Sequence, residues 1–205
     1  MKEALGTVAI VMAFLAYAPY LRDILVRRTI PHPYSWFVWS FSSSLIFGLQ
    51  LSHGAGYGAY VTGCMAAICL LIGILAYRNG AGRSITSTDT VLFVVALIAA
   101  ALWLFVDQPI LSIVLLVSAD LIAILPSVRK AWHKPYEETL SMWVINALRH
   151  CVAIGALAHY NIVTVLDPLT WVITNTAFAI LLVLRRRFVE SPRRRNSRSH
   201  TRRHR

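Results

Sequence analysis

Long runs of apolar residues, separated by short clusters of charged residues, are the feature that most limits what this chain of 205 residues can fold into. Hydrophobic residues make up 57% of the chain and charged residues only 14%, whereas a soluble domain has about a quarter of its residues charged. A membrane-spanning helix needs about 20 mainly apolar residues. On this basis the sequence predicts spans at residues 4–26, 34–52, 57–77, 88–106, 109–128, 139–159 and 167–184.

The predicted fold class is therefore an all-α membrane protein with seven transmembrane helices. Turn-forming residues occupy the breaks between the spans, as at Pro31–Pro33 and Lys134–Pro135. Asp167-Pro168 is predicted to start the last span, because an acidic cap followed by proline is typical of a helix N-terminus. The first apolar run lacks a signal-peptide cleavage site, so we interpret it as a span.

Lysine and arginine predict the orientation of these spans. One set of helix ends carries almost all of these residues, and the opposite set carries only Lys2. By the positive-inside rule the basic set is cytoplasmic, which places the N-terminus outside and the C-terminus in the cytoplasm, and we expect the plasma membrane. The basic residues in question are Arg22, Arg27, Arg28, Arg78, Arg83, Arg129, Lys130, Lys134 and those of the C-terminal tail.

The formal net charge of +11 comes mostly from Arg185–Arg187 and from the tail at 191–205. We predict that this tail is disordered and meets anionic lipid headgroups at the cytoplasmic face of the bilayer. Nucleic-acid binding is disfavoured, since no aromatic residues are interleaved with the arginines to stack on bases. The oligomeric state stays open, and a homo-oligomer is one option.

Comparison of the chain with itself reveals an internal repeat at an offset of 107 residues. Without gaps, Pro19 aligns with Pro126 and Trp36 with Trp143, and several arginines also align. The alignment predicts a first three-helix repeat at 1–84, a linker transmembrane helix at 85–107 and a second three-helix repeat at 108–190, a 3+1+3 layout. An odd linker span keeps the two repeats parallel.

The repeated segments, Tyr17–Arg22 with Ser35–Trp39 and Ile124–Arg129 with Thr139–Trp143, resemble the PQ-loop/SWEET-like superfamily of seven-helix membrane transporters. The chain looks like a divergent member. The resemblance covers spans one to three and five to seven, and it implies a carrier of small solutes. In carriers of this kind an asparagine near the position of Asn175 contacts the substrate, so the resemblance places Asn175 in the site.

Polar residues deep in a bilayer are costly and mark candidate sites. Asp120 and Arg149 lie at similar depths, about 12 and 15 Å from the cytoplasmic ends of their spans at 1.5 Å per residue, so we expect them to pair. This pair could line a cavity or could be a structural ion pair. Asn146, Arg149 and His150 fall on one helix face, so the predicted substrate-binding residues are Asp120, Asn146, Arg149, His150 and Asn175.

Four further residues are predicted to act as hinges or gates. Pro19 and Pro126 each remove a hydrogen bond from the first helix of a repeat and are candidate hinges, or they bend the helix only to fit its neighbours. Trp36 and Trp143 are candidate gates, with interfacial anchoring as the alternative.

The leading hypothesis is a small-solute carrier that works by alternating access between the two repeats. Its substrate would be a polar or anionic small molecule, because Arg149 favours a carboxylate or phosphate. The alternative is a ligand-binding receptor or sorting protein on the same fold that does not transport its ligand. We expect no enzymatic activity, no cofactor and no metal site, since the sequence contains none of the motifs that such chemistry needs.

Overall fold

The computed structural model describes residues 1–80, 87, 90–91, 94, 105 and 108–189. Regular structure within these residues is helical throughout. The predicted linker helix at 88–106 lies almost entirely outside the described residues, and the predicted tail at 191–205 lies wholly outside them.

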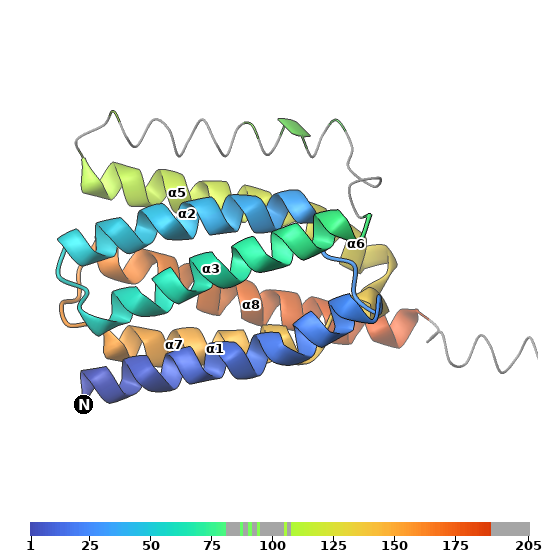
Figure 1. Cartoon of the computed structure of the whole chain (residues 1–205), viewed down its shortest axis with the longest axis horizontal. Coiled ribbons are helices and arrows are strands. Elements are labelled where there is room, and N and C mark those ends of the chain that lie inside the picture. The colour runs from blue at the N-terminus through green and yellow to red at the C-terminus, as the bar shows by residue number, and fades with distance from the viewer. Residues whose placement is uncertain (81–86, 88–89, 92–93, 95–104, 106–107, 190–205) are drawn as a thin grey trace, which may run out of the picture.

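The helices form a bundle with nearly aligned axes (Figure 1). Their bounds are α1 Lys2–Leu25, α2 Pro33–Ser52, α3 Tyr57–Arg78, α5 Pro109–Ala123, α6 Leu125–His133, α7 Leu140–Ala156 and α8 Ile162–Phe188, with a 3₁₀ turn, η2, at Pro135–Glu137.

Four of the described helical segments are long and apolar enough to cross a membrane: Lys2–Leu25, Tyr57–Arg78, Pro109–His133 and Ile162–Phe188. The third runs through α5 and α6. The predicted spans at 34–52 and 139–159 also form helices, but they do not reach this standard. Six serines and Gln50 lower the hydropathy of α2, and α7 has only 17 residues, against the roughly 20 that a bilayer needs.

The start of α8 differs from the prediction. Asp167-Pro168 does not begin the helix. Instead Asn161 caps it in a reciprocal pair with Thr164, whose backbone N–H donates to Asn161 Oδ1 at 3.0 Å. Pro168 therefore lies inside α8 and leaves the carbonyl of Thr164 without its helical donor. The side chain of Gln50 on α2 approaches that carbonyl, with 3.5 Å between Nε2 and O.

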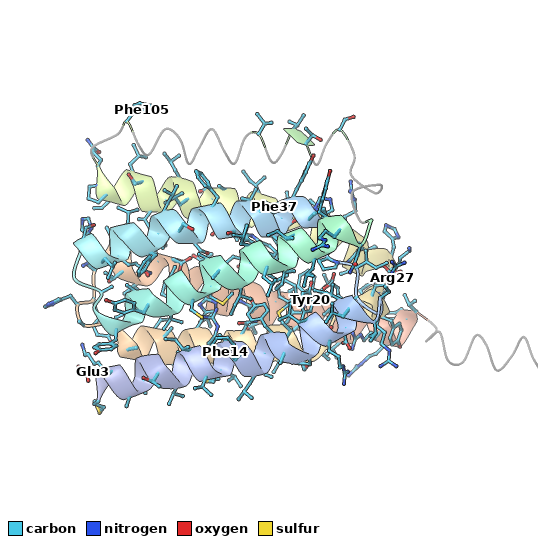
Figure 2. All side chains as sticks on the ribbon, in the orientation of Figure 1. Glu3, Phe14, Tyr20, Arg27, Phe37 and Phe105 are labelled. Atoms are coloured by element: carbon cyan, nitrogen blue, oxygen red, sulfur yellow. The ribbon has the colours of Figure 1, made fainter. Side chains whose placement is uncertain are left out.

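The bundle exposes many large apolar side chains on its surface, and its largely apolar interior also contains several polar ones. Phe14 is 58% exposed on the outer face of α1 (Figure 2), and Ile173 is 63% exposed on α8. Large exposed apolar surfaces need an apolar environment. The buried polar side chains include Ser42, Gln50, Asp120, Asn146, Arg149 and Asn175.

The helices pack in a pattern that repeats. In the N-terminal set α3 packs against both α1 and α2, and in the C-terminal set α8 packs against both α5 and α7. The two sets meet where α1 packs on α7 and where α2 packs on α5. Exchanging α1, α2 and α3 for α5, α7 and α8 maps each of these packed pairs onto another, so the packing has the two-fold pattern that a duplicated unit would give.

The basic residues gather at one end of the bundle, which we call the basic end. There Lys130 pairs with Glu138 and also donates to the carbonyl of Ile30, which joins the two helix sets. Thr139 Oγ1 donates to Asp23 Oδ2 at 3.0 Å, a second link between the sets.

At the opposite end, which we call the far end, backbone groups of the two helix sets come into direct contact. The N–H of Ala158 donates to the carbonyl of Ala55 at 3.0 Å. Gly58 lies so close to Leu157 that an added Cβ would be 2.7 Å from Leu157 Cδ2. Both ends of the bundle are therefore closed by contacts that run between the two helix sets.

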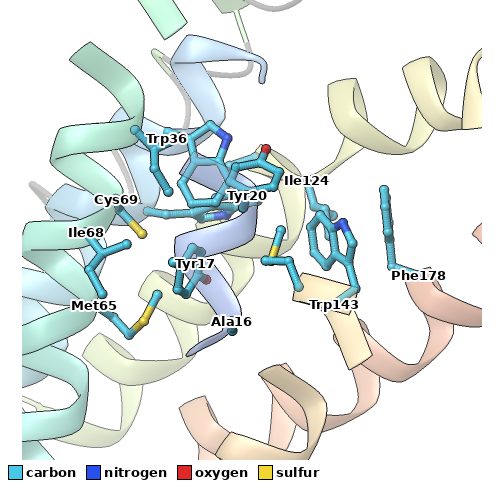
Figure 3. Packing of buried hydrophobic residues seen from close by; sticks show 14 of the residues in the cluster. Ala16, Tyr17, Tyr20, Trp36, Met65, Ile68, Cys69, Ile124, Trp143 and Phe178 are labelled. Atoms are coloured by element: carbon cyan, nitrogen blue, oxygen red, sulfur yellow. The ribbon is translucent and has the colours of Figure 1, made fainter. Parts of the chain in front are cut away.

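Aromatic side chains pack together inside the bundle (Figure 3). Trp36 packs against Tyr17 and Tyr20, and Trp143 packs on Phe178 with ring centroids 4.0 Å apart. Trp36 is only 2% exposed and Trp143 only 3%. The interfacial-anchor interpretation of these two tryptophans is therefore wrong, because an anchor must reach the membrane surface.

The two prolines aligned by the repeat differ in their local structure. Pro19 lies within the continuous helix α1, whereas Pro126 is in the first turn of α6, just after α5 ends at Ala123. Only Pro126 thus marks an actual break between two helices. Whether either proline acts as a hinge stays a prediction.

Candidate functional site

A small cavity lies inside the bundle, between the two helix sets. Its volume is about 40 Å³, measured as the space open to the centre of a water-sized sphere. One water needs about 10–15 Å³ on this measure, so the cavity has room for about three waters. Among its lining residues are Tyr17, Trp36, Trp39, Ser43, Gln50, Gly58, Thr62, Cys69, Trp143, Arg149, His150, Leu157, Asp167, Trp171 and Asn175.

Arg149 is the central charge of this site. Its side chain is 1% exposed, and it is among the largest fully buried side chains in the described part of the chain. Its Nε donates to Asn146 Oδ1 at 2.8 Å, and Nη2 donates to His150 Nε2 at 2.5 Å. A guanidinium has five N–H donors, so three remain for a ligand or for water in the cavity.

Asn146 positions Arg149 and does not itself line the cavity. Its amide nitrogen donates back to the carbonyl of Met142 at 3.0 Å, one turn earlier in α7. This bond orients the amide so that its oxygen faces Arg149. The structure thus brings Asn146, Arg149 and His150 together as their spacing predicted.

The predicted pair of Asp120 with Arg149 does not form. Asp120 is 3% exposed, and neither of its carboxylate oxygens has a hydrogen-bond partner among the described residues. The Ser42 hydroxyl on α2 lies near this carboxylate and is likewise buried without a hydrogen-bond partner among the described residues. The order of the helices across the bundle explains why. Because α8 lies between α5 and α7, a whole helix separates a side chain on α5 from Arg149. Asp120 lies outside the cavity.

The carboxylate that does share the cavity with Arg149 is Asp167 on α8, which sequence reasoning missed. It is 5% exposed and lines the cavity. Its side chain and those of Trp171 and Asn175 are spaced four residues apart, so they form one stripe on the helix. That spacing was visible in the sequence, but the interpretation of Asp167-Pro168 as a helix start concealed it.

Aromatic rings form the walls around these charges. The ring of Trp171 lies parallel to that of His150, with centroids 6.2 Å apart, and Trp39 meets Trp171 edge-on at 5.4 Å. The indole N–H of Trp39 donates to the carbonyl of Asp120 at 3.1 Å, which fixes this ring across the α2–α5 contact. Asn175 donates to the carbonyl of Trp171 at 2.6 Å, so its amide oxygen remains available to a solute.

The lining of the cavity includes residues toward both ends of the bundle. Trp36 and Trp143, which the repeat aligns, both line it on the side of the basic end. Gly58 and Leu157 line it on the side of the far end, where their backbones come into close contact. The described residues thus line a cavity that is largely apolar but contains a buried cation and a buried carboxylate.

No protein-family model, curated protein or solved structure matches this chain significantly.

Proposed function

We propose that this chain is a small-solute membrane carrier of the PQ-loop/SWEET-like kind, which works by alternating access between two three-helix repeats. The repeats are residues 1–84 and 108–190, joined by a linker helix at 85–107. Its substrate is a polar or anionic small molecule that binds in the cavity between them. The basic end faces the cytoplasm, in accordance with the positive-inside rule, and the plasma membrane is the proposed location.

The single observation that carries this proposal is Arg149, a buried cation that lines an internal cavity without a carboxylate in contact. No nitrogen of Arg149 lies within 4.0 Å of an acidic oxygen in the described part of the chain. A buried charge without a partner is expensive, and the cost is recovered when an anionic ligand binds. A purely structural arginine would instead be expected to contact its counter-charge directly.

The packing of the helix sets supports movement between two states. The cavity lies where the sets meet, and the contacts that close each end also run between the sets. If the sets rock about the cavity, contacts at one end separate while those at the other persist. That is the geometry which alternating access requires.

Uptake of labelled carboxylates into sealed proteoliposomes tests the proposal. The native protein should accumulate at least one of them, and Arg149→Gln should abolish that uptake. The matched control is Arg78→Gln, which removes the same charge from an exposed position at the end of α3. Equal uptake by both variants would refute the site assignment.

The same preparation separates a carrier from a receptor. A receptor or sorting protein on this fold would bind the solute, and Arg149→Gln would weaken that binding, yet no label would accumulate inside the vesicles. Binding without accumulation would therefore replace the carrier with the receptor.

A further inference from the structure

The cavity contains a second buried charged group, and the binding of a simple anion would not involve that group. The Asp167 carboxylate lines the cavity beside the Trp171 indole, and no cationic nitrogen in the described part of the chain lies within 4.0 Å of it. Asp167 is close enough to Arg149 for the two charges to influence each other, yet the pair does not make contact within 4.0 Å. The cavity therefore presents one cation and one anion that are both buried and kept apart.

Such an arrangement suits a solute with the opposite pair of charges. A monoanion would satisfy Arg149 but would add its negative charge to a cavity that already holds the Asp167 carboxylate. A zwitterion would engage both groups and add no net charge, so each buried ion would gain a charge-assisted partner.

We propose that the cavity binds a small zwitterion, whose carboxylate contacts Arg149 and whose ammonium group contacts Asp167. This inference rests on the proposed function and narrows its substrate class. The ammonium group would also lie near the ring of Trp171, where a cation gains from the face of the indole. With a volume of about 40 Å³, the cavity accommodates only a short aliphatic chain between the two charged groups.

Binding to the purified full-length protein tests the inference, because Trp39 and Trp171 line the cavity and report a ligand by their fluorescence. The probes are glycine, β-alanine and 4-aminobutyrate, each compared with the carboxylate that lacks only the amino group: acetate, propionate and butyrate. At least one amino compound should bind about 10- to 100-fold more tightly than its matched carboxylate, the value of one buried charged hydrogen bond.

Asp167→Asn should weaken binding of that amino compound by about the same factor and abolish its advantage over the carboxylate. Asp167→Glu retains the charge on a longer side chain, so it should shift the preference toward a shorter solute. This second variant keeps the test decisive if Asp167→Asn fails to fold.

The outcomes distinguish the two proposals. Equal affinity of the native protein for an amino compound and its matched carboxylate overturns the zwitterion and leaves the carrier in place. A preference for the amino compound that survives in Asp167→Asn and does not shift in Asp167→Glu also overturns it. If no probe binds and none enters sealed vesicles, both proposals fail.

Discussion

Replacement of Asn146 gives the sharpest test of how the site is built, because Asn146 contacts Arg149 without lining the cavity. Asn146→Ala removes the acceptor of the 2.8 Å bond from Arg149 Nε and leaves that donor buried. A hydrogen bond to a charged group contributes about 1.5–3 kcal/mol to the free energy of unfolding. For a chain of this size, each kcal/mol lost from the free energy of unfolding lowers the melting temperature by about 2–4 °C. We therefore expect the melting temperature to fall by about 3–12 °C.

The companion variant Asn146→Asp separates stability from binding. It places a carboxylate where the amide oxygen was, so Arg149 gains a counter-charge inside the protein. Formation of such a pair roughly balances the cost of burying the new charge, and the melting temperature should fall less than in Asn146→Ala. Binding of an anionic group should nevertheless decrease strongly, because the guanidinium is already neutralised.

Both variants are measured by thermal unfolding in detergent and by uptake into proteoliposomes, with Arg78→Gln as the control for loss of an exposed charge. A melting temperature unchanged in Asn146→Ala would refute the reasoning that this bond holds Arg149. Native uptake in Asn146→Asp would show that the charge of Arg149 is not what the substrate binds.

Three further predictions concern stability and use thermal unfolding of the purified protein. Glu138→Ala leaves Lys130 without its counter-charge in a largely buried place and should cost about 3–5 kcal/mol. Gly58→Val forces a side chain into the close contact at the far end and should cost about 1–3 kcal/mol. Trp39→Phe keeps an aromatic ring beside Trp171 but loses the indole donor, at a cost of about 0.5–1.5 kcal/mol.

Matched variants control the first two of these predictions. Glu137→Ala removes a neighbouring carboxylate whose partner, Lys134, is exposed, and it should cost less than about 1 kcal/mol. Gly48→Ala adds a Cβ where no atom lies within 4 Å, so it should leave stability unchanged or raise it slightly. Equal losses in a variant and its control would show that burial or close packing is not the cause.

Several features along the individual helices of this protein were predictable from its sequence. Apolar runs and turn residues identified the breaks at Pro31–Pro33 and Lys134–Pro135, because helix-breaking chemistry is local. The shared face of Arg149 with Asn146 and His150 also followed from helical spacing alone. The start of α8 could not be predicted in this way. An Asp-Pro pair such as Asp167-Pro168 looks the same in the sequence whether it begins a helix or lies inside a helix that an earlier residue caps.

Which helices lie side by side in the bundle was decided only by the tertiary structure. Sequence gives the depth of a residue along its helix, but not which helix lies beside it, and Asp120 and Arg149 were expected to pair on depth alone. Because α8 packs between α5 and α7, Arg149 shares its cavity with Asp167, while Asp120 lies near Ser42 of α2 and has no hydrogen-bond partner among the described residues. The neighbour of a buried charge depends on the packing of whole helices against each other, and that packing is the sum of many contacts spread over the chain.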